Sequence, residues 1–179
     1  MKRHVALVGF MASGKSTIGR KLARRLGWLF VDTDAIVVRK HGGIAAIFER
    51  EGEAYFRRYE EEAIRDALAA LDRSVVALGG GALTEAANRA LLAQRAYRVF
   101  IKVSPEQILT RLRRSRDVRP LLGRTPTLAR IRELYAQRLG HYESVDRVIE
   151  ASGRSDAGVI EEIVEWLRDC DPAGGRAAS

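Results

Sequence analysis

The chain has few residues of the kinds that build disulfides or transition-metal sites. Its 179 residues include one cysteine, Cys170, and three histidines, His4, His41 and His141. A single cysteine excludes an internal disulfide and suits a reducing cytoplasm. The histidines are scattered along the sequence, so we expect no metal site built from His and Cys. The chemistry of this protein must therefore rest on other residue types.

Long hydrophobic runs are also missing. No apolar stretch approaches the roughly 20 residues that a membrane-spanning helix needs, so we expect no membrane partner. The first three residues lead directly into an apolar strand and leave no room for a signal peptide, which favours a cytoplasmic location. With 46% hydrophobic residues, the sequence predicts one domain over residues 1–170. Residues 171–179, which contain Pro172, Gly174 and Gly175, are predicted to be a disordered tail.

Negative charge is in deficit, because 31 Lys and Arg face 23 Asp and Glu for a formal net charge of +8. Such a field favours anionic ligands. Much of the excess is arginine between residues 111 and 124, which small phosphorylated ligands explain as well as nucleic acid does. The aromatic residues that single-strand binders interleave with basic ones are lacking, so we expect no nucleic-acid partner. A nucleic-acid-binding ATPase and a regulatory nucleotide switch rank below an enzyme acting on small molecules.

The most informative segment is GFMASGKS at residues 9–16, a complete G-x-x-x-x-G-K-S phosphate-binding loop. An apolar run at residues 4–8 precedes it and is typical of a buried parallel strand. Ile18, Leu22 and Leu26 follow at helical spacing, and Gly27 occupies the position of a C-terminal cap. In this context Lys15 is expected to reach the β- and γ-phosphates of a nucleoside triphosphate and Ser16 to bind Mg²⁺.

Strands and helices alternate along the rest of the chain. Further strands are predicted at residues 28–31, 75–78, 97–102 and 145–149, and further helices at 35–40, 44–50, 53–71, 85–95, 105–111, 127–141 and 159–167. This alternation predicts an α/β fold with a parallel sheet covered by helices on both faces. Ligands of such sheets bind beyond the carboxyl ends of the strands, so the phosphate loop, residues 32–34 and residues 79–81 should line one crevice.

Two carboxylates follow the second predicted strand. Asp32 and Asp34 point the same way if the segment stays extended, because side chains in a strand alternate. Beside a triphosphate, one could serve Mg²⁺ through water and the other an acceptor hydroxyl, as phosphoryl transfer requires. The alternative is that Asp32 only caps the next helix.

The triplet Gly79, Gly80 and Gly81 follows the third predicted strand and would let the backbone approach a ligand closely, although a plain turn is the alternative.

Arginines are solvated surface residues by default, and this holds for Arg57 and Arg138 until a structure says otherwise. Arg119 differs, because it precedes Pro120 in a cation-rich segment without apolar periodicity. We interpret residues 112–125 as a mobile lid that brings guanidinium charge to a transferring phosphoryl group.

Taken together, GFMASGKST, VDTD, FRRYE, ALGGGAL, VRPLL and the arginine of AQRLGHY, in this order and spacing, resemble shikimate kinase over nearly the whole chain. Nucleoside monophosphate kinases share the loop and the lid but not the D-x-D, F-R and G-G-G combination. The resemblance implies a three-layer P-loop kinase fold, like that of nucleoside monophosphate kinases, with a parallel sheet of strand order 2-3-1-4-5. It further implies a monomer that uses ATP and one Mg²⁺ ion per subunit to phosphorylate the 3-hydroxyl of shikimate. A gluconate-type kinase is the alternative within this fold.

The resemblance also implies roles for individual residues. The catalytic residues would be Asp34, Lys15 and Arg119, and the metal would be held by Ser16 and, through water, Asp32. Shikimate would be bound within a helical region at about residues 33–61 and by Asp34, Arg57, Gly79, Gly80, Gly81 and Arg138. ATP would contact Gly9, Ala12, Ser13, Gly14, Lys15, Ser16, Thr17, Arg114, Arg119 and Arg154, with Arg114 and Arg154 on either side of the adenine.

Two positions depart from the family pattern. Ala12 stands where the family usually has glycine, and its methyl group shifts the loop if this position needs a positive φ. The segment between Arg114 and Arg119 is short, which bears on the adenine contacts.

Overall fold

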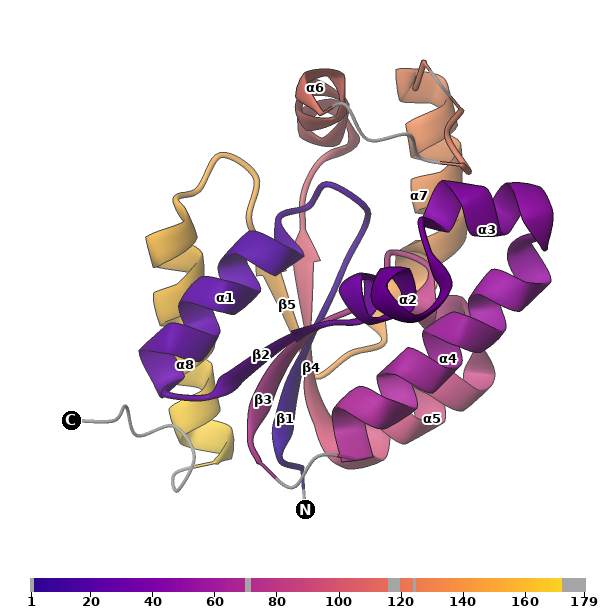
Figure 1. Cartoon of the computed structure of the whole chain (residues 1–179). Coiled ribbons are helices and arrows are strands. Elements are labelled where there is room, and N and C mark those ends of the chain that lie inside the picture. The colour runs from indigo at the N-terminus through magenta and orange to yellow at the C-terminus, as the bar shows by residue number, and fades with distance from the viewer. Residues whose placement is uncertain (1, 70–71, 116–119, 124, 172–179) are drawn as a thin grey trace.

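Five parallel strands form the central sheet in the computed structural model, which describes residues 2–69, 72–115, 120–123 and 125–171 (Figure 1). The strands are β1 (His4–Val8), β2 (Leu29–Asp32), β3 (Ser74–Ala77), β4 (Ala96–Lys102) and β5 (Arg147–Glu150). Their order across the sheet is β2-β3-β1-β4-β5, and every neighbouring pair is parallel. The predicted strand order 2-3-1-4-5 is therefore confirmed.

Helices connect the strands. They are α1 (Lys15–Leu26), α2 (Thr33–His41), α3 (Ile44–Arg50), α4 (Glu53–Ala69), the short 3-10 helix η1 (Ala82–Thr84), α5 (Ala86–Arg95), α6 (Pro105–Arg114), α7 (Leu128–Glu143) and α8 (Asp156–Cys170). Figure 1 shows α1 and α8 on one face of the sheet and α4 and α5 on the other. This is the three-layer arrangement that the alternating pattern predicts.

The C-terminal helix is longer than predicted at both ends. It begins at Asp156 because the Ser155 side chain accepts a hydrogen bond from the Gly158 amide, a capping contact that apolar spacing does not reveal. It continues to Cys170, and Asp171 forms an ion pair with Arg73. Asp171 is therefore held by the fold, whereas the rest of the tail expected to be disordered, residues 172–179, lies outside the described residues.

The central strand positions the phosphate loop. β1 is buried along its whole length between β3 and β4 and leads directly into residues 9–14. α1 then begins after Gly14, whose φ of 98° is left-handed, and ends at Leu26, where Gly27 with φ 69° forms the C-terminal cap. The loop is thus fixed at the carboxyl edge of the sheet by a strand and a helix that are both packed in the core.

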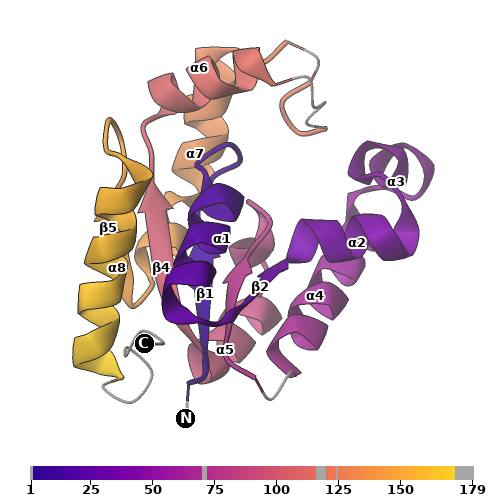
Figure 2. The ribbon, with the colours of Figure 1, turned by 60° about the vertical axis from the view of Figure 1, so that its left-hand side comes forward.

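A second, smaller apolar cluster lies beneath α2, α3 and α4 and is formed by Val37, Ile47, Phe56 and Ala63. Of these helices, α2 and α3 project beside the carboxyl edge of the sheet, whereas α4 runs back along its face (Figure 2). The three helices correspond to the helical region predicted at about residues 33–61. Among the described residues, no helix has the length and apolar character needed to cross a membrane.

Candidate active site

The phosphate loop closes around the ammonium group of Lys15. Lys15 Nζ donates to the carbonyl oxygens of Gly9 (2.9 Å) and Phe10 (2.8 Å), and its side chain is buried. Ser13 is also buried, and its Oγ lies 3.4 Å from Lys15 Nζ. Thr17 is exposed and lines a hollow beside the phosphate loop. The loop therefore places a positive charge beside the N-terminus of α1, where backbone amides already favour an anion.

Ala12 adopts φ 59° and is the non-glycine residue with a positive φ in the described part of the chain. The departure from the family pattern thus falls where a side chain is strained. The Ala12 carbonyl accepts a hydrogen bond of 3.1 Å from Arg111 on α6. Arg111 was not among the predicted site residues, although it lies one turn before the predicted ATP contact Arg114 on the same helix.

Asp32 caps α2, as one of the two alternatives predicts, and it also contacts the serine that is expected to bind Mg²⁺. Its Oδ2 accepts a 2.6 Å hydrogen bond from Ser16 Oγ, and its Oδ1 accepts from the Ala35 amide (3.3 Å) at the start of α2. The cap holds the carboxylate in place, and the carboxylate in turn meets the serine hydroxyl. These hard oxygen donors beside a phosphate loop are the kind that Mg²⁺ prefers.

The glycine triplet is required by close packing on three sides. A Cβ on Gly79 would collide with Glu60 and lie 2.8 Å from Asp34 Oδ1, and one on Gly81 would overlap the Arg57 guanidinium. A Cβ on Gly80 would lie 3.1 Å from the Met11 amide nitrogen. A plain turn does not account for this arrangement. Because side chains are absent here, charged groups of α2 and α4 approach the end of β3.

Arg57 is held by two carboxylates of its own helix. It donates to Glu60 Oε2 (2.7 Å) and to Glu53 Oε1 (2.9 Å). Glu60 is fully buried, and its pKa is raised to about 7. The main cause is desolvation, and the nearby charge of Asp34 also raises the pKa, whereas Arg57 lowers it. Glu60 was not predicted as a site residue. Its signal was an acid on the apolar face of α4, four residues after Phe56.

Arg138 is buried as well, so the default assignment to the solvated surface is wrong for this residue. Its side chain donates to the Gly80 carbonyl (3.1 Å), and its guanidinium carbon lies 5.8 Å from the centre of the Phe10 ring. Tyr142, one turn later on α7, donates its hydroxyl to the same carbonyl. Tyr142 was also missed, because its partner is 62 residues away in the sequence.

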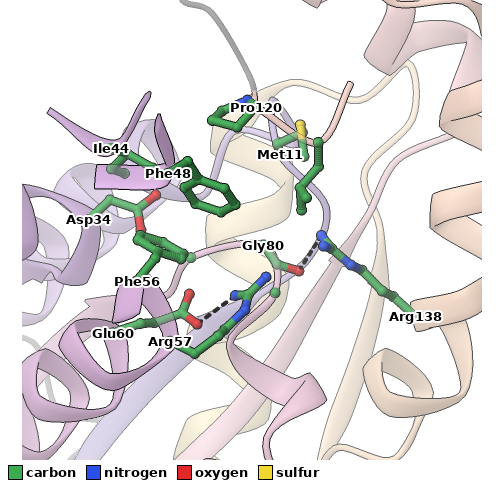
Figure 3. Close-up of a pocket in the computed structure, with 13 residues that line it drawn as sticks. Met11, Asp34, Ile44, Phe48, Phe56, Arg57, Glu60, Gly80, Pro120 and Arg138 are labelled. Carbon is green, nitrogen blue, oxygen red and sulfur yellow. Dashed lines mark hydrogen bonds and ion pairs between the residues drawn. The ribbon is translucent and has the colours of Figure 1, made fainter. Parts of the chain in front are cut away.

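Two adjoining hollows result. The first is shown in Figure 3 and is lined by Met11, Asp34, Ile44, Phe48, Phe56, Arg57, Glu60, Gly79, Gly80, Gly81, Pro120, Leu121 and Arg138. The second is lined by Met11, Ala12, Gly14, Lys15, Ser16, Thr17, Asp32, Asp34, Leu78 and Gly80. Asp34 borders both. The three predicted segments at the carboxyl edge are thus brought together, with an apolar wall and two guanidinium groups on one side and the phosphate loop on the other.

Two predicted ATP contacts, Arg114 and Arg154, do not line either hollow, and a third is not described. Arg119 lies outside the described residues, although the Pro120 and Leu121 that follow it line the first hollow. Arg114 is exposed at the end of α6. Arg154 donates to carbonyls of Glu150 and Gly158 and pairs with Glu162 (2.6 Å), which fixes it between β5 and α8. Their roles stay predictions.

Known proteins resemble this chain over nearly its full length. A model of the shikimate kinase family matches residues 11–168. The shikimate kinase of Geobacter sulfurreducens is 44% identical over 168 residues, covering 93% of this chain and 92% of that protein. That of Thiobacillus denitrificans is 43% identical over 177 residues, covering 94% and 96%.

Solved structures agree with the sequence matches. Shikimate kinase from Acinetobacter baumannii in complex with shikimate has a TM-score of 0.87 and 34% identity, with 96% of each chain covered. A sugar kinase from Janibacter, at 21% identity and a TM-score of 0.62, shares the fold alone. On the family model, the sequence identities and the shared structure, the chain belongs to the shikimate kinase family.

Proposed function

We propose that this chain transfers the γ-phosphoryl group of ATP to the 3-hydroxyl of shikimate, with the first hollow as the acceptor site and the second as the phosphate site. The observation that carries this assignment is the position of Asp34, which borders both hollows. A hydroxyl beside Asp34 would face a phosphate held at Lys15. Phosphoryl transfer depends on such positioning of acceptor and donor.

The carboxylate of shikimate would bind between Arg57 and Arg138. Each guanidinium carries five N–H donors, and the hydrogen bonds to Glu53, Glu60 and Gly80 use only some of them. The remaining donors suit a carboxylate, which guanidinium groups bind in bidentate fashion. Phe48, Phe56 and Leu121 would pack against the ring, while the Gly79–Gly81 backbone leaves room for it.

Asp34 would accept a hydrogen bond from the 3-hydroxyl and take up its proton as the bond to phosphorus forms. Lys15 and the loop amides would hold the β- and γ-phosphate oxygens and stabilise the charge that develops on them. Arg119, in the predicted lid, would add guanidinium charge to the transferring group. Arg111 is better placed than Arg114 to flank the nucleotide, because it already contacts the loop through the Ala12 carbonyl.

A magnesium ion fits the oxygen donors at Ser16 and Asp32, which lie 2.6 Å apart. In the described residues, no group of three His, Cys, Asp or Glu side chains could hold a metal ion, which fits an ion held mainly by one hydroxyl, water and phosphate. When bound, Mg²⁺ would neutralise charge on the β- and γ-phosphates. Ser16 would contact it directly and Asp32 through water.

An ADP-release assay on the purified chain tests the proposal. ATP turnover is expected only with both Mg²⁺ and shikimate, to be lost on chelation and restored by added Mg²⁺. Gluconate, nucleoside monophosphates and DNA should not support it. Turnover with gluconate in place of shikimate, or ATP hydrolysis that needs no acceptor, would contradict the proposal.

Two substitutions test the assigned roles. Lys15→Met should reduce kcat by at least about 10³-fold, the scale of losing one stabilising charge, while circular dichroism shows an intact fold. Asp34→Asn keeps the size of the side chain and should lower kcat by about 10²-fold or more, since a general base contributes on that order. Arg24→Gln, an exposed residue of α1 outside both hollows, is the matched control and should leave turnover unchanged.

The proposal also includes a monomeric protein in the cytoplasm. Size-exclusion chromatography with light scattering would test whether the chain is a monomer.

A further inference from the structure

A third hollow lies on the other side of Asp32 from the phosphate loop. It is a groove of about 540 Å³ beside the edge strand β2, between α1, α2 and α4. We call it the β2 groove, and it is lined by Arg20, Phe30, Val31, Asp32, Ala35, Ile36, Arg39, Asp66 and Ala67. Its size lies within the range of small-molecule sites. Neither the reaction proposed above nor the phosphate loop uses it.

The two walls of the β2 groove carry one arginine each. Arg20 comes from α1 and Arg39 from α2, and neither has an acidic partner in the part of the chain that the structure describes. The acids of the groove are engaged elsewhere, because Asp66 pairs with Lys40 (2.7 Å) and Asp32 accepts from Ser16 and the Ala35 amide. The groove therefore presents two guanidinium groups that form no ion pair with a described acid, although the carboxylate of Asp32 also borders it.

The floor between these arginines is apolar. Phe30 packs against α1 at Gly19, where an added Cβ would lie 2.6 Å from a ring carbon, so a helix-interior glycine makes room for the ring. Arg20 lies over the same ring, 5.2 Å from its centre. On α2, Ile36 and Ala35 lie three and four residues before Arg39, which puts all three on one face of the helix. A groove with cations above an apolar floor suits a ligand that carries both a negative charge and an apolar group.

We propose that the β2 groove binds a small organic carboxylate with an apolar ring. The carboxylate would pair with Arg20 and Arg39, and the ring would lie on Phe30, Val31 and Ile36. Guanidinium groups bind carboxylates through paired N–H donors, and burying the ring removes apolar surface from water. An inorganic anion would leave the floor uncovered, and a neutral ring would leave the arginines unpaired. Because Asp32 borders both this groove and the phosphate site, the ligand would sit directly behind the residue assigned to the metal.

Titration of the full-length chain with 3-phenylpropanoate tests this proposal. Amide chemical shifts followed by NMR are expected to change at Phe30, Ile36 and Arg39 with a Kd of about 1 mM or tighter, the strength expected for one paired carboxylate and one buried ring. Arg20→Gln and Arg39→Gln should each weaken binding by about tenfold, the effect of losing a charged hydrogen bond. Arg24→Gln, on α1 but outside the groove, should bind as the unsubstituted chain does. Thermal melting would verify that each variant is folded.

Two further ligands and a series of protein concentrations distinguish the proposed ligand from a neutral ring, an inorganic anion and a second copy of the chain. 3-Phenylpropanol, which keeps the ring but lacks the charge, and sulfate, which keeps a charge but lacks the ring, should each bind at least about tenfold more weakly. Equal binding of all three, or binding that both glutamine variants leave unchanged, would overturn the proposal. It would also be overturned if the groove resonances shifted on raising the protein concentration alone, because the occupant would then be a second copy pairing at β2. All these readouts are independent of kinase activity.

Discussion

Arg138 and Tyr142, one turn apart on α7, both donate to the carbonyl oxygen of Gly80. Both side chains are buried, and burial raises the pKa of Tyr142 to about 12, so its hydroxyl stays protonated and donates throughout the physiological range. These two hydrogen bonds hold Gly80, the middle residue of the glycine triplet, against α7. The orientation of Gly80, and with it the shape of the acceptor hollow, therefore depends on α7.

Tyr142→Phe removes one of the two donors and leaves the ring packing on Phe100 in place. We expect KM for shikimate to rise by about five- to tenfold, the cost of one hydrogen bond, with a smaller change in KM for ATP. Steady-state kinetics with each substrate varied in turn would measure this. Tyr135→Phe is the matched control, since Tyr135 is also buried on α7 but donates no hydrogen bond to Gly80. A rise confined to KM for ATP would show that the hydroxyl does not act on the acceptor hollow.

Arg138→Lys keeps a positive charge but loses the planar pair of donors. If Arg138 holds the carboxylate of shikimate, KM for shikimate should rise by at least about tenfold while KM for ATP stays nearly constant. Arg138→Ala should raise it further. The control is Arg132→Lys, an exposed residue on the same helix that pairs with Glu106. Unchanged shikimate kinetics in Arg138→Lys would remove Arg138 from the proposed carboxylate site.

Glu60 makes the stability of the fold depend on pH. Its pKa rises from an ordinary 4.5 to about 7 on folding, chiefly because burial disfavours the charge. Between these values the folded chain holds a proton that the unfolded chain has released, so the contribution to stability is greatest below about pH 4.5 and is lost as pH rises through about 7. The loss should be on the order of 1–3 kcal/mol.

Glu60→Gln should remove this slope. Urea unfolding at several pH values between 5 and 8 would compare the variant with the unsubstituted chain, and Glu61→Gln, a less buried position on the same helix, serves as the control. Equal slopes in Glu60→Gln and the unsubstituted chain would mean that Glu60 is already charged at pH 5. Arg57 would then hold its pKa near the ordinary value.

Ala12→Gly should stabilise the fold. Ala12 is held at φ 59°, where glycine is unstrained, so removing the methyl group should raise the free energy of unfolding by about 0.5–1 kcal/mol after the greater flexibility of the unfolded chain is subtracted. Chemical denaturation would measure it. Ala90→Gly, at an exposed position within α5, should change stability in the opposite direction by about 1 kcal/mol. Destabilisation by both substitutions would show that the loop does not strain Ala12.

The glycine triplet and Asp32 illustrate which part of the site could be predicted from the sequence and which part could not. Their position after predicted strands was enough to group them at the carboxyl edge, because parallel strands all end there. Whether Asp32 only caps a helix could not be decided from spacing. The structure shows that one of its oxygens caps α2 while the other accepts a hydrogen bond from Ser16, because β2 and α1 bring the serine, 16 residues away in the sequence, within 2.6 Å.

Local spacing alone determined the alternation of strands and helices and the phosphate loop with Lys15 and Ser16, whereas the family was indicated by the resemblance of several motifs spread over nearly the whole chain. The alternation and the loop depend on residues within a few turns of one another, and their pattern is visible in the chain itself. Only the tertiary structure decided that Arg138 is buried, that Glu60 holds Arg57 beside Asp34, that Tyr142 fastens Gly80, and that Arg20 and Arg39 face one groove. The reason is that burial and most of these contacts join elements far apart in the sequence, and their side-chain distances follow from how helices pack on the sheet rather than from any local pattern.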